Sequence, residues 1–153
     1  MSENGTNEPQ YLSRYEHGVD EKRRLQIPSK WRSEDPNLVY TVIYWSKGAL
    51  QPPCLLVLPP TAMKRLMGKI AEMSFSDPKA EALRRFLGAN SDTVTPDKSG
   101  RVCLPDEMAK KAGIGEKAIL IGMFDRFQIW SPENYNAVNV IDDAHSMEAL
   151  ALI

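Results

Sequence analysis

The sequence lacks most of the features that mark a catalytic or metal-binding protein. Its 153 residues include only two histidines, His17 and His145, and two cysteines, Cys54 and Cys103, all well separated along the chain. Metal sites need clustered His or Cys ligands, and nucleophilic enzymes need a recognisable Ser–His–Asp or Cys–His setting. No glycine-rich phosphate loop is present. We therefore expect no catalytic residue, no metal site, no cofactor and no enzyme activity.

Long apolar runs and an excess of one charge are also absent. No run approaches the roughly 18 apolar residues of a membrane helix, and the N-terminus carries no signal-peptide core. We therefore expect no membrane partner, a cytoplasmic location and cysteines that are reduced and buried. The formal net charge of −1 argues against a protein that coats nucleic acid by overall charge. It leaves room for a local basic patch.

One short pattern occurs twice. The stretch Asp20–Pro28, DEKRRLQIP, is matched by Asp97–Pro105, DKSGRVCLP. In each, an Asp precedes an Arg by four positions, and two aliphatic residues then alternate toward a closing Pro. The alternation predicts a strand with one buried face, and the Asp together with Gly100 is typical of a turn. A plain turn between strands explains the pattern, and so does a cationic binding loop, so both interpretations stay open at this point.

The first of these turns is strongly basic. Between Glu21 and Arg32 five basic residues accompany one acidic residue, whereas the second turn carries only Lys98 and Arg101. A turn tip with two or three cations can enter a DNA major groove, where Arg forks onto guanine and Lys holds phosphates. One such tip would bind weakly, and several tips spaced by an oligomer would bind well, because linked sites raise the effective concentration.

The residues around the two turns follow one plan in both halves. Apolar runs rich in β-branched and aromatic residues predict strands, and apolar residues at helical spacing predict helices. Ser76 or Asp77 can cap the helix that joins the halves, and Gly88 can close it. Ser131 and Pro132 are a good start for a further helix. We expect strands at residues 38–45, 54–58, 117–123 and 126–130, and helices at 59–73, 78–88, 106–112 and 132–138. Residues 139–153 could form a short helix or a tail with an apolar tip that docks on another surface.

Taken together, these stretches resemble the MraZ family of bacterial regulators. The likeness rests on the doubled turn and on CLLVLPPTAMKRL, LRRFLGANSDTVTPDKSGRVCLP and AILIGMFDRFQIWSPENY, in that order, and covers roughly residues 10 to 140. It implies a mainly β fold with short helices (α+β), built from two tandem AbrB/MazE-like β-barrel modules with swapped hairpins. The implied division is a disordered tail (1–10), a first SpoVT-AbrB-like module (11–75), a linking helix (76–91), a second such module (92–138) and a C-terminal tail (139–153).

The resemblance also implies a function. The family consists of sequence-specific regulators of the division and cell-wall gene cluster, which form multi-subunit rings and bind promoter direct repeats through Asp-x-x-x-Arg loops. The expected partners are therefore double-stranded DNA and further copies of the chain, in the cytoplasm at the nucleoid. The implied DNA-binding residues are Lys22, Arg23, Arg24, Lys98 and Arg101, and the implied turn-organising residues are Asp20, Asp97 and Gly100.

Two departures from the family pattern make the turns unequal. Arg23 stands where the family has glycine, so it must accept an unusual φ or reshape the turn, and Ser99 stands where the family has lysine. We therefore expect the first turn to bind more strongly. The alternative function is an AbrB/MazE-like interaction module of the antitoxin type, whose acidic tail would wrap a toxin. A purely structural ring is a third interpretation, and the salt dependence of binding to duplex DNA separates a DNA reader from both.

Overall fold

The fold is described from a computed structural model, which covers residues 8–48 and 51–153. Most of the tail expected at residues 1–10 therefore lies outside the described residues. The elements are β1 (Arg14–Gly18), β2 (Arg24–Gln26), the 3-10 turn η1 (Ser29–Trp31), β3 (Tyr40–Trp45), β4 (Cys54–Leu58), α1 (Pro60–Ala71), α2 (Pro78–Ala89), β5 (Ser91–Val94), β6 (Arg101–Cys103), α3 (Asp106–Lys111), β7 (Lys117–Gly122), β8 (Phe127–Trp130) and α4 (Pro132–Leu150).

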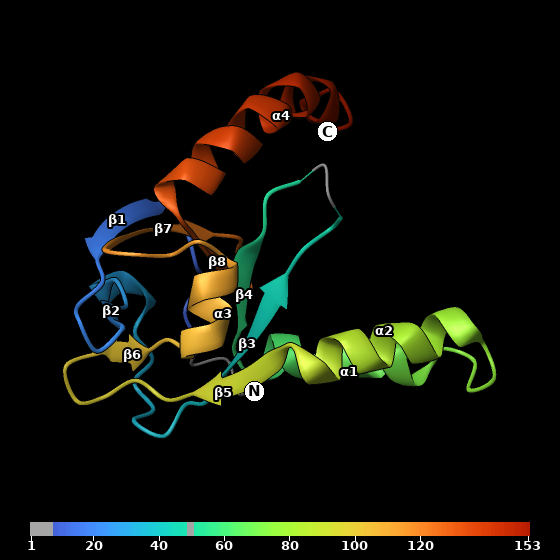
Figure 1. The fold of residues 1–153 in the computed structure, drawn as a ribbon, viewed down its shortest axis with the longest axis horizontal. Coiled ribbons are helices and arrows are strands. Elements are labelled where there is room, and N and C mark those ends of the chain that lie inside the picture. Colours follow the sequence, from blue (N-terminus) through green and yellow to red (C-terminus); the bar gives the residue numbers. More distant parts are fainter. Residues whose placement is uncertain (1–7, 49–50) are drawn as a thin grey trace.

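The strands of the two halves interleave. Six of them form one antiparallel sheet in the order β1-β7-β8-β4-β3-β5, and β2 and β6 form a separate two-stranded ribbon (Figure 1). Strand β1 of the first half pairs with β7 of the second, and β5 of the second half pairs with β3 of the first. The counterparts in the two halves are β1 and β5, β3 and β7, and β4 and β8. When each strand is replaced by its counterpart, the same strand order is obtained in reverse. The predicted fold class, a sheet-rich α+β fold, is confirmed.

The main core joins the ribbon to one face of the sheet. Leu25 and Val102, which lie opposite each other in the ribbon, are buried together with Leu55, Leu120 and Ile129 from the sheet. Each of these side chains stabilises the fold by about 1.5–3 kcal/mol through the apolar surface it removes from water. The ribbon is therefore fixed to the sheet by its inner face, and only its outer face is available for binding.

Helices cover the other face of the sheet. Ile43 and Leu56 point to this side, where α1 and α2 pack around them. The start of α4 covers Ile119 and Trp130 in the same way. Figure 1 shows α1 and α2 lying side by side and extending away from the ribbon. Strand β4 is buried along its whole length, which explains its uninterrupted apolar sequence.

Most of the predicted helix boundaries are confirmed. The Asp77 carboxylate accepts a hydrogen bond from the backbone N–H of Lys79, and the Ser131 hydroxyl accepts one from Asn134, so both residues cap their helices. The prediction that Gly88 closes α2 is wrong. The helix continues to Ala89, because both the backbone N–H and the side-chain amide of Asn90 donate to the carbonyl oxygen of Phe86 and cap the helix there.

Helix α4 is longer than the predicted stretch of helix after Ser131. It runs to Leu150 without a break at residue 139, where the sequence suggests that a C-terminal tail begins. No glycine or proline follows Pro132, so nothing in the sequence interrupts the helix. Val138 is its last buried residue, and Figure 1 shows the outer half projecting from the rest of the chain. Across residues 8–48 and 51–153, no helix combines the length and apolar character needed to span a bilayer.

Candidate nucleic-acid interface

The first loop, Asp20–Arg24, is organised around one carboxylate. Asp20 Oδ1 accepts hydrogen bonds from the backbone N–H groups of Lys22 at 2.9 Å and Arg24 at 2.8 Å. Asp20 Oδ2 accepts a third from Arg24 Nε at 2.7 Å. The backbone N–H of Arg23 closes the turn by donating to the Asp20 carbonyl oxygen at 2.9 Å. A single side chain therefore fixes both the turn and the direction of the Arg24 side chain.

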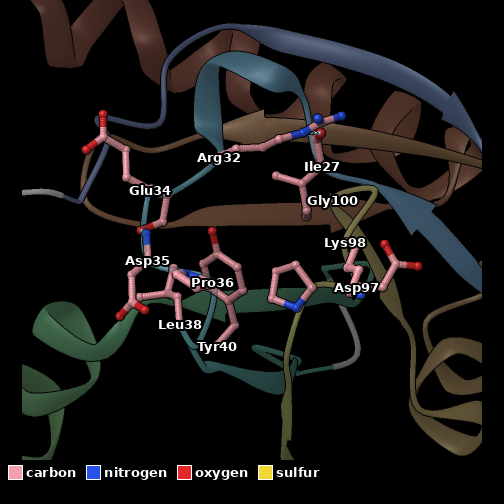
Figure 2. Close-up of a pocket in the computed structure, with 12 residues that line it drawn as sticks. Ile27, Arg32, Glu34, Asp35, Pro36, Leu38, Tyr40, Asp97, Lys98 and Gly100 are labelled. Atoms are coloured by element: carbon pink, nitrogen blue, oxygen red, sulfur yellow. Dashed lines mark hydrogen bonds between the residues drawn. The ribbon is translucent and has the colours of Figure 1, made fainter.

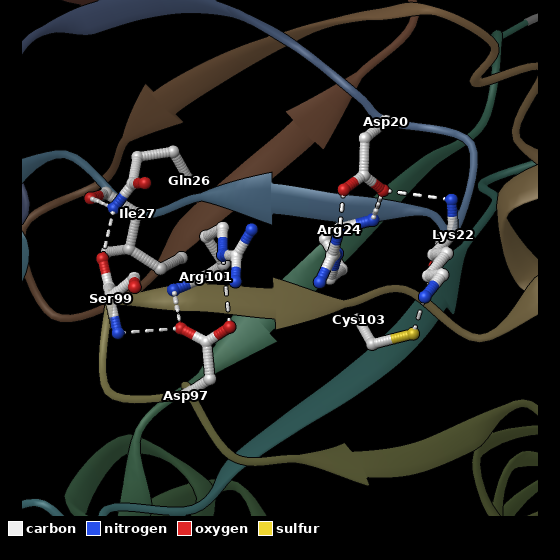
Figure 3. A network of polar contacts seen from close by, with 9 residues as sticks. All are labelled: Asp20, Lys22, Arg24, Gln26, Ile27, Asp97, Ser99, Arg101 and Cys103. Carbon is white, nitrogen blue, oxygen red and sulfur yellow. Dashed lines mark hydrogen bonds and ion pairs between the residues drawn. The ribbon is translucent and has the colours of Figure 1, made fainter.

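The second loop, Asp97–Arg101, repeats these contacts. Asp97 Oδ1 accepts from the N–H groups of Ser99 at 2.9 Å and Arg101 at 3.0 Å. Asp97 Oδ2 pairs with Arg101 Nε at 3.0 Å, and the N–H of Gly100 closes the turn at 2.9 Å. Figure 3 shows the two networks at opposite edges of the ribbon, that of Asp20 beside β2 and that of Asp97 beside β6. The repeated sequence therefore encodes a repeated geometry.

The pKa of each carboxylate is lowered from its usual value by the contacts within its loop. The hydrogen bond from the backbone N–H of Arg24 is the main reason that the pKa of Asp20 is lowered. The N–H of Arg101 lowers the pKa of Asp97 in the same way. Because each carboxylate accepts hydrogen bonds from two backbone N–H groups and one Arg Nε, much of its negative charge is neutralised within its own loop.

The two arginines lie on the same face of one ribbon. Strand β2 pairs with β6 in antiparallel register, with Arg24 opposite Cys103, Leu25 opposite Val102, and Gln26 opposite Arg101. Because Leu25 and Val102 point inward, the other four side chains point outward. The Arg24 and Arg101 side chains are equally exposed, at 35% each. Each loop precedes its strand, so the loops leave the ribbon at opposite ends.

Each loop is held by the other half of the chain. The N–H of Ile27 donates to the carbonyl oxygen of Gly100, and the N–H of Leu104 donates to that of Arg23, both at 2.9 Å. Side chains add a second, reciprocal pair of contacts. Gln26 Nε2 donates to the Ser99 carbonyl oxygen at 2.8 Å, and Cys103 Sγ lies 3.3 Å from that of Lys22. Each loop is therefore fixed by hydrogen bonds to the strand of the other repeat.

The residues predicted to contact DNA differ in their exposure and in the hydrogen bonds and ion pairs that they already make within the chain. Lys22 and Lys98 are exposed at the two loop tips. Arg24 and Arg101 each use Nε for their own aspartate, and their Nη groups make no hydrogen bond within the described residues. Arg23 does adopt the unusual backbone conformation that the sequence suggests, with φ of 61°. Its side chain forms an ion pair with Asp106 at the start of α3.

The cysteines behave differently from each other. Cys54 is buried in β4, and burial raises the pKa of its thiol to about 12. The prediction that Cys103 is also buried is wrong, because Val102 and Leu104 take the inward positions and strand alternation turns Cys103 outward. Within the described part of the chain, no group of three or more His, Cys, Asp or Glu side chains could hold a metal ion.

Sequence reasoning missed one member of this surface. Gln26 shares the outer face with both arginines and reaches the second loop tip. The available signal was the strand alternation itself, since residues two apart on a strand face the same side. Placing Arg24 on the outer face would have placed Gln26 there too.

Comparison with known proteins gives consistent matches. A family profile described as "MraZ protein, putative antitoxin-like" matches residues 86–150. The transcriptional regulator MraZ of Thermomicrobium roseum is 35% identical over 130 residues, which cover 83% of this chain and 85% of that protein. The protein of the same name from Herpetosiphon aurantiacus is 36% identical over 143 residues, 93% of each chain. That of Clostridium tetani is 32% identical over 130 residues, 84% of this chain and 87% of the relative.

Proposed function

Because this chain belongs to the MraZ family of transcriptional regulators, we propose that it regulates transcription by binding double-stranded DNA through the outer face of the β2–β6 ribbon and its two loops. The observation that carries this proposal is the placement of Arg24 and Arg101. Both are partly exposed on one face, and each is oriented by an aspartate that pairs with Nε, while the Nη groups make no hydrogen bond among residues 8–48 and 51–153.

The chemistry of these arginines suits guanine. An Arg that presents two N–H groups in one plane can donate to O6 and N7 of a guanine in the major groove. Holding Nε on Asp20 or Asp97 restricts the side chain before DNA arrives, so less conformational entropy is lost on binding. We assign base contacts to Arg24 and Arg101 for this reason, and phosphate contacts to Lys22, Arg23 and Lys98 at the loop tips.

The dimensions of the ribbon also fit DNA. A major groove about 12 Å wide admits a two-stranded antiparallel ribbon. The ribbon here has three residues per strand, so it is about 10 Å long at roughly 3.3 Å per residue. With a loop leaving each end, the lysines would reach the phosphates on either side while the arginines face the base edges.

One ribbon offers few contacts, so we propose that several copies act together. In a ring of subunits, ribbons from neighbouring copies would meet successive direct repeats in a promoter, and linkage would raise the total affinity. The target we propose is the division and cell-wall gene cluster, which places the protein at the nucleoid. Occupancy of the promoter would then change the access of RNA polymerase.

The decisive test is a double variant, Arg24→Ala with Arg101→Ala. A labelled duplex covering the region upstream of the chain's own gene would be titrated at two salt concentrations, with particle mass measured by light scattering. We expect binding to weaken at least about 30-fold, since each base-contacting Arg contributes about 1–3 kcal/mol. Particle mass should be unchanged, because neither side chain belongs to the core.

The matched control is Lys64→Ala with Lys69→Ala. These exposed lysines lie on α1, away from the ribbon, and their removal changes the net charge by the same amount. Binding should stay within about threefold of the parent if position rather than total charge decides it. Equal losses in the two double variants, or no loss from the arginine variant, would refute the assignment of the ribbon.

The alternative function, an antitoxin-type interaction module, has less support. It requires a disordered acidic tail that wraps a partner, whereas Asp142, Asp143 and Glu148 lie within helix α4. The name of the matching family profile does include the words "antitoxin-like". A chain that binds no duplex DNA at low salt would favour this alternative.

A further inference from the structure

Gly100 in the second loop makes room for a side chain from elsewhere. It has φ of +81°, and a Cβ added there would lie 2.8 Å from Cζ and 3.0 Å from Cδ of Arg32. The Arg32 side chain therefore lies directly on the backbone of the second loop. In the first loop the equivalent position is Arg23, with φ of 61°, which carries a guanidinium of its own.

The position that supports each loop also differs between the two repeats. The repeat places Ala109 at the position that corresponds to Arg32, and Ala109 is a small, buried residue of α3. One repeat thus has arginine on the loop and alanine at the supporting position. The other has glycine on the loop and arginine at the supporting position. Besides the arginine of its Asp-x-x-x-Arg motif, each loop therefore has one guanidinium, which comes from the loop itself in the first repeat (Arg23) and from the supporting position in the second (Arg32).

The surroundings of Arg32 leave its charge available. Within the part of the chain that the structure describes, its Nε makes only a long hydrogen bond, 3.4 Å, to the Ile27 carbonyl oxygen, and the residue is exposed. No carboxylate forms an ion pair with it among residues 8–48 and 51–153, in contrast to Arg23, which is paired with Asp106. Arg32 lines a cleft of about 550 Å³ together with Asp97 and Lys98 of the second loop.

The acidic residues of this cleft do not neutralise Arg32. Figure 2 places the carboxylates of Glu34 and Asp35 on the opposite side of the cleft from the Arg32 guanidinium, which lies beside Ile27 and Gly100. The Asp97 carboxylate is occupied by Arg101 and by two backbone N–H groups.

We propose that Arg32 binds a DNA phosphate and completes the second loop, where it supplies the guanidinium that Gly100 lacks. The inference rests on the proposed function and adds a residue to it. A guanidinium binds phosphate oxygens in a bidentate manner, and the glycine lets it approach the loop backbone closely. The second loop then offers Lys98, Arg32 and Arg101, against Lys22, Arg23 and Arg24 in the first. Since Arg23 is partly neutralised by Asp106, the second loop is not the weaker of the two.

The test compares Arg32→Gln with Lys30→Gln. Both side chains are exposed, both substitutions remove one positive charge, and the residues are two positions apart. With the same upstream duplex as probe, Arg32→Gln should weaken binding about tenfold, and Lys30→Gln less than about twofold. The slope of log affinity against log salt is negative, and it should become shallower by about 0.9 for every loop that loses its phosphate contact. Unfolding curves should match the parent, which confirms that the fold is intact.

A second variant moves Arg32 without changing it. In Gly100→Ala the new methyl group would displace the guanidinium from the loop and would also strain the backbone at φ of +81°. Binding should therefore weaken although Arg32 and Arg101 both remain. If Arg32→Gln and Lys30→Gln bind DNA equally well, the inference about Arg32 is overturned while the proposed function stands. If the parent itself shows no salt-dependent binding to the duplex, the proposed function is overturned and the inference with it.

Discussion

The side-chain amide of Gln26 donates a hydrogen bond of 2.8 Å to the backbone carbonyl oxygen of Ser99, at the tip of the second loop. The equivalent contact at the first loop is made by the Cys103 thiol, 3.3 Å from the carbonyl oxygen of Lys22. A thiol is a weak donor and an amide is a good one. The two loop tips are therefore held by the same arrangement at different strengths, each by the strand of the other repeat.

Removing Gln26 should loosen the second loop and leave the first loop intact. In Gln26→Ala we expect faster amide hydrogen exchange at Lys98, Ser99 and Gly100, with a loss of overall stability of about 1 kcal/mol, as for one hydrogen bond. DNA affinity should fall several-fold, because the loop must be ordered again on binding. Exchange measured by mass spectrometry or NMR would check the first point.

The control for this experiment is Cys103→Ala, which removes the weaker contact at the first loop. Its effect on exchange at Glu21, Lys22 and Arg23 should be smaller than the effect of Gln26→Ala on the second loop. If Gln26→Ala changes exchange in neither loop, the side-chain contact does not hold the tip.

The order of both loops should depend on pH in the acidic range. The pKa values of Asp20 and Asp97 are lowered in the folded protein, because their carboxylates accept backbone N–H groups and pair with arginine. Carboxylates of this kind stabilise the folded loop above their unfolded-state pKa of about 3.9. That contribution disappears as the pH falls through the lower pKa of the folded state. Between pH 7 and about 5 we therefore expect no change.

NMR shifts of the Arg24 and Arg101 amide protons would report these titrations, since each amide donates to one of the carboxylates. Both should move only below about pH 4, the ordinary Asp range. Asp97→Asn should abolish the titration at Arg101 and leave that at Arg24 in place. A midpoint above the ordinary Asp range at either amide would mean that the carboxylate is not stabilised in its charged form.

The parts of the fold that follow from short-range patterns could be predicted. Alternating aliphatic residues identified the inner face of the ribbon, and Leu25 and Val102 are indeed buried. The uninterrupted apolar run at residues 54–58 identified a strand, and the structure covers it on both faces, with α1 on one side and the main core on the other. Asp77 and Ser131 marked helix starts, because their side chains can accept a backbone N–H only at that position.

The edge strands could not be predicted. Strands β1 and β5 lie at the two edges of the sheet, and their side chains are exposed or half-exposed throughout. Their inward side chains, Tyr15 and Val94, are only half-buried against the core, so the strands lack a continuous apolar face and the sequence gives no local signal for them. Their hydrogen bonds go to β7 and β3 of the other half. Such pairing depends on chain segments far apart, which a window of a few residues does not contain.

The candidate site was predictable in its residues but not in its contacts. The repeated Asp-x-x-x-Arg spacing pointed to Asp20, Arg24, Asp97 and Arg101, and the structure gives these residues matching geometry. The pairing of Arg23 with Asp106 joins the two halves of the chain, and no local spacing reveals it. Contacts of this kind decide which cations are free, and they require the fold.

Two glycines in regular elements should respond to alanine in opposite directions. A Cβ on Gly122 would lie 2.5 Å from the carbonyl carbon of Tyr11 and 2.7 Å from the backbone N of Leu12, neither of which can move freely. Gly122→Ala should therefore destabilise the protein by about 1–3 kcal/mol through overpacking. Gly68 lies in α1 with open space around it, so Gly68→Ala should stabilise by roughly 0.5–1 kcal/mol. Urea unfolding of both variants would test the pair, and a stable Gly122→Ala would mean that the backbone of Tyr11 and Leu12, just before β1, does not pack against Gly122 as described.

Removing the partner of Arg23 should strengthen DNA binding. The Asp106 carboxylate pairs with Lys110 and also with Arg23, and these contacts lower its pKa, that with Lys110 the most. In Asp106→Asn the Arg23 guanidinium at the first loop becomes free to contact a phosphate. Affinity for the upstream duplex should rise, and the salt slope should steepen by up to about 0.9 for every loop that gains a contact.

Glu107→Gln is the matched control for Asp106→Asn, because Glu107 is the next residue, is exposed, and forms no ion pair with Arg23 among the described residues. It removes the same charge from the first turn of α3. If both variants bind more tightly by the same factor, the gain comes from net charge and Arg23 does not contact DNA. If only Asp106→Asn gains affinity, and the gain disappears when Arg23→Ala is added, then Asp106 restrains a DNA contact in the resting protein.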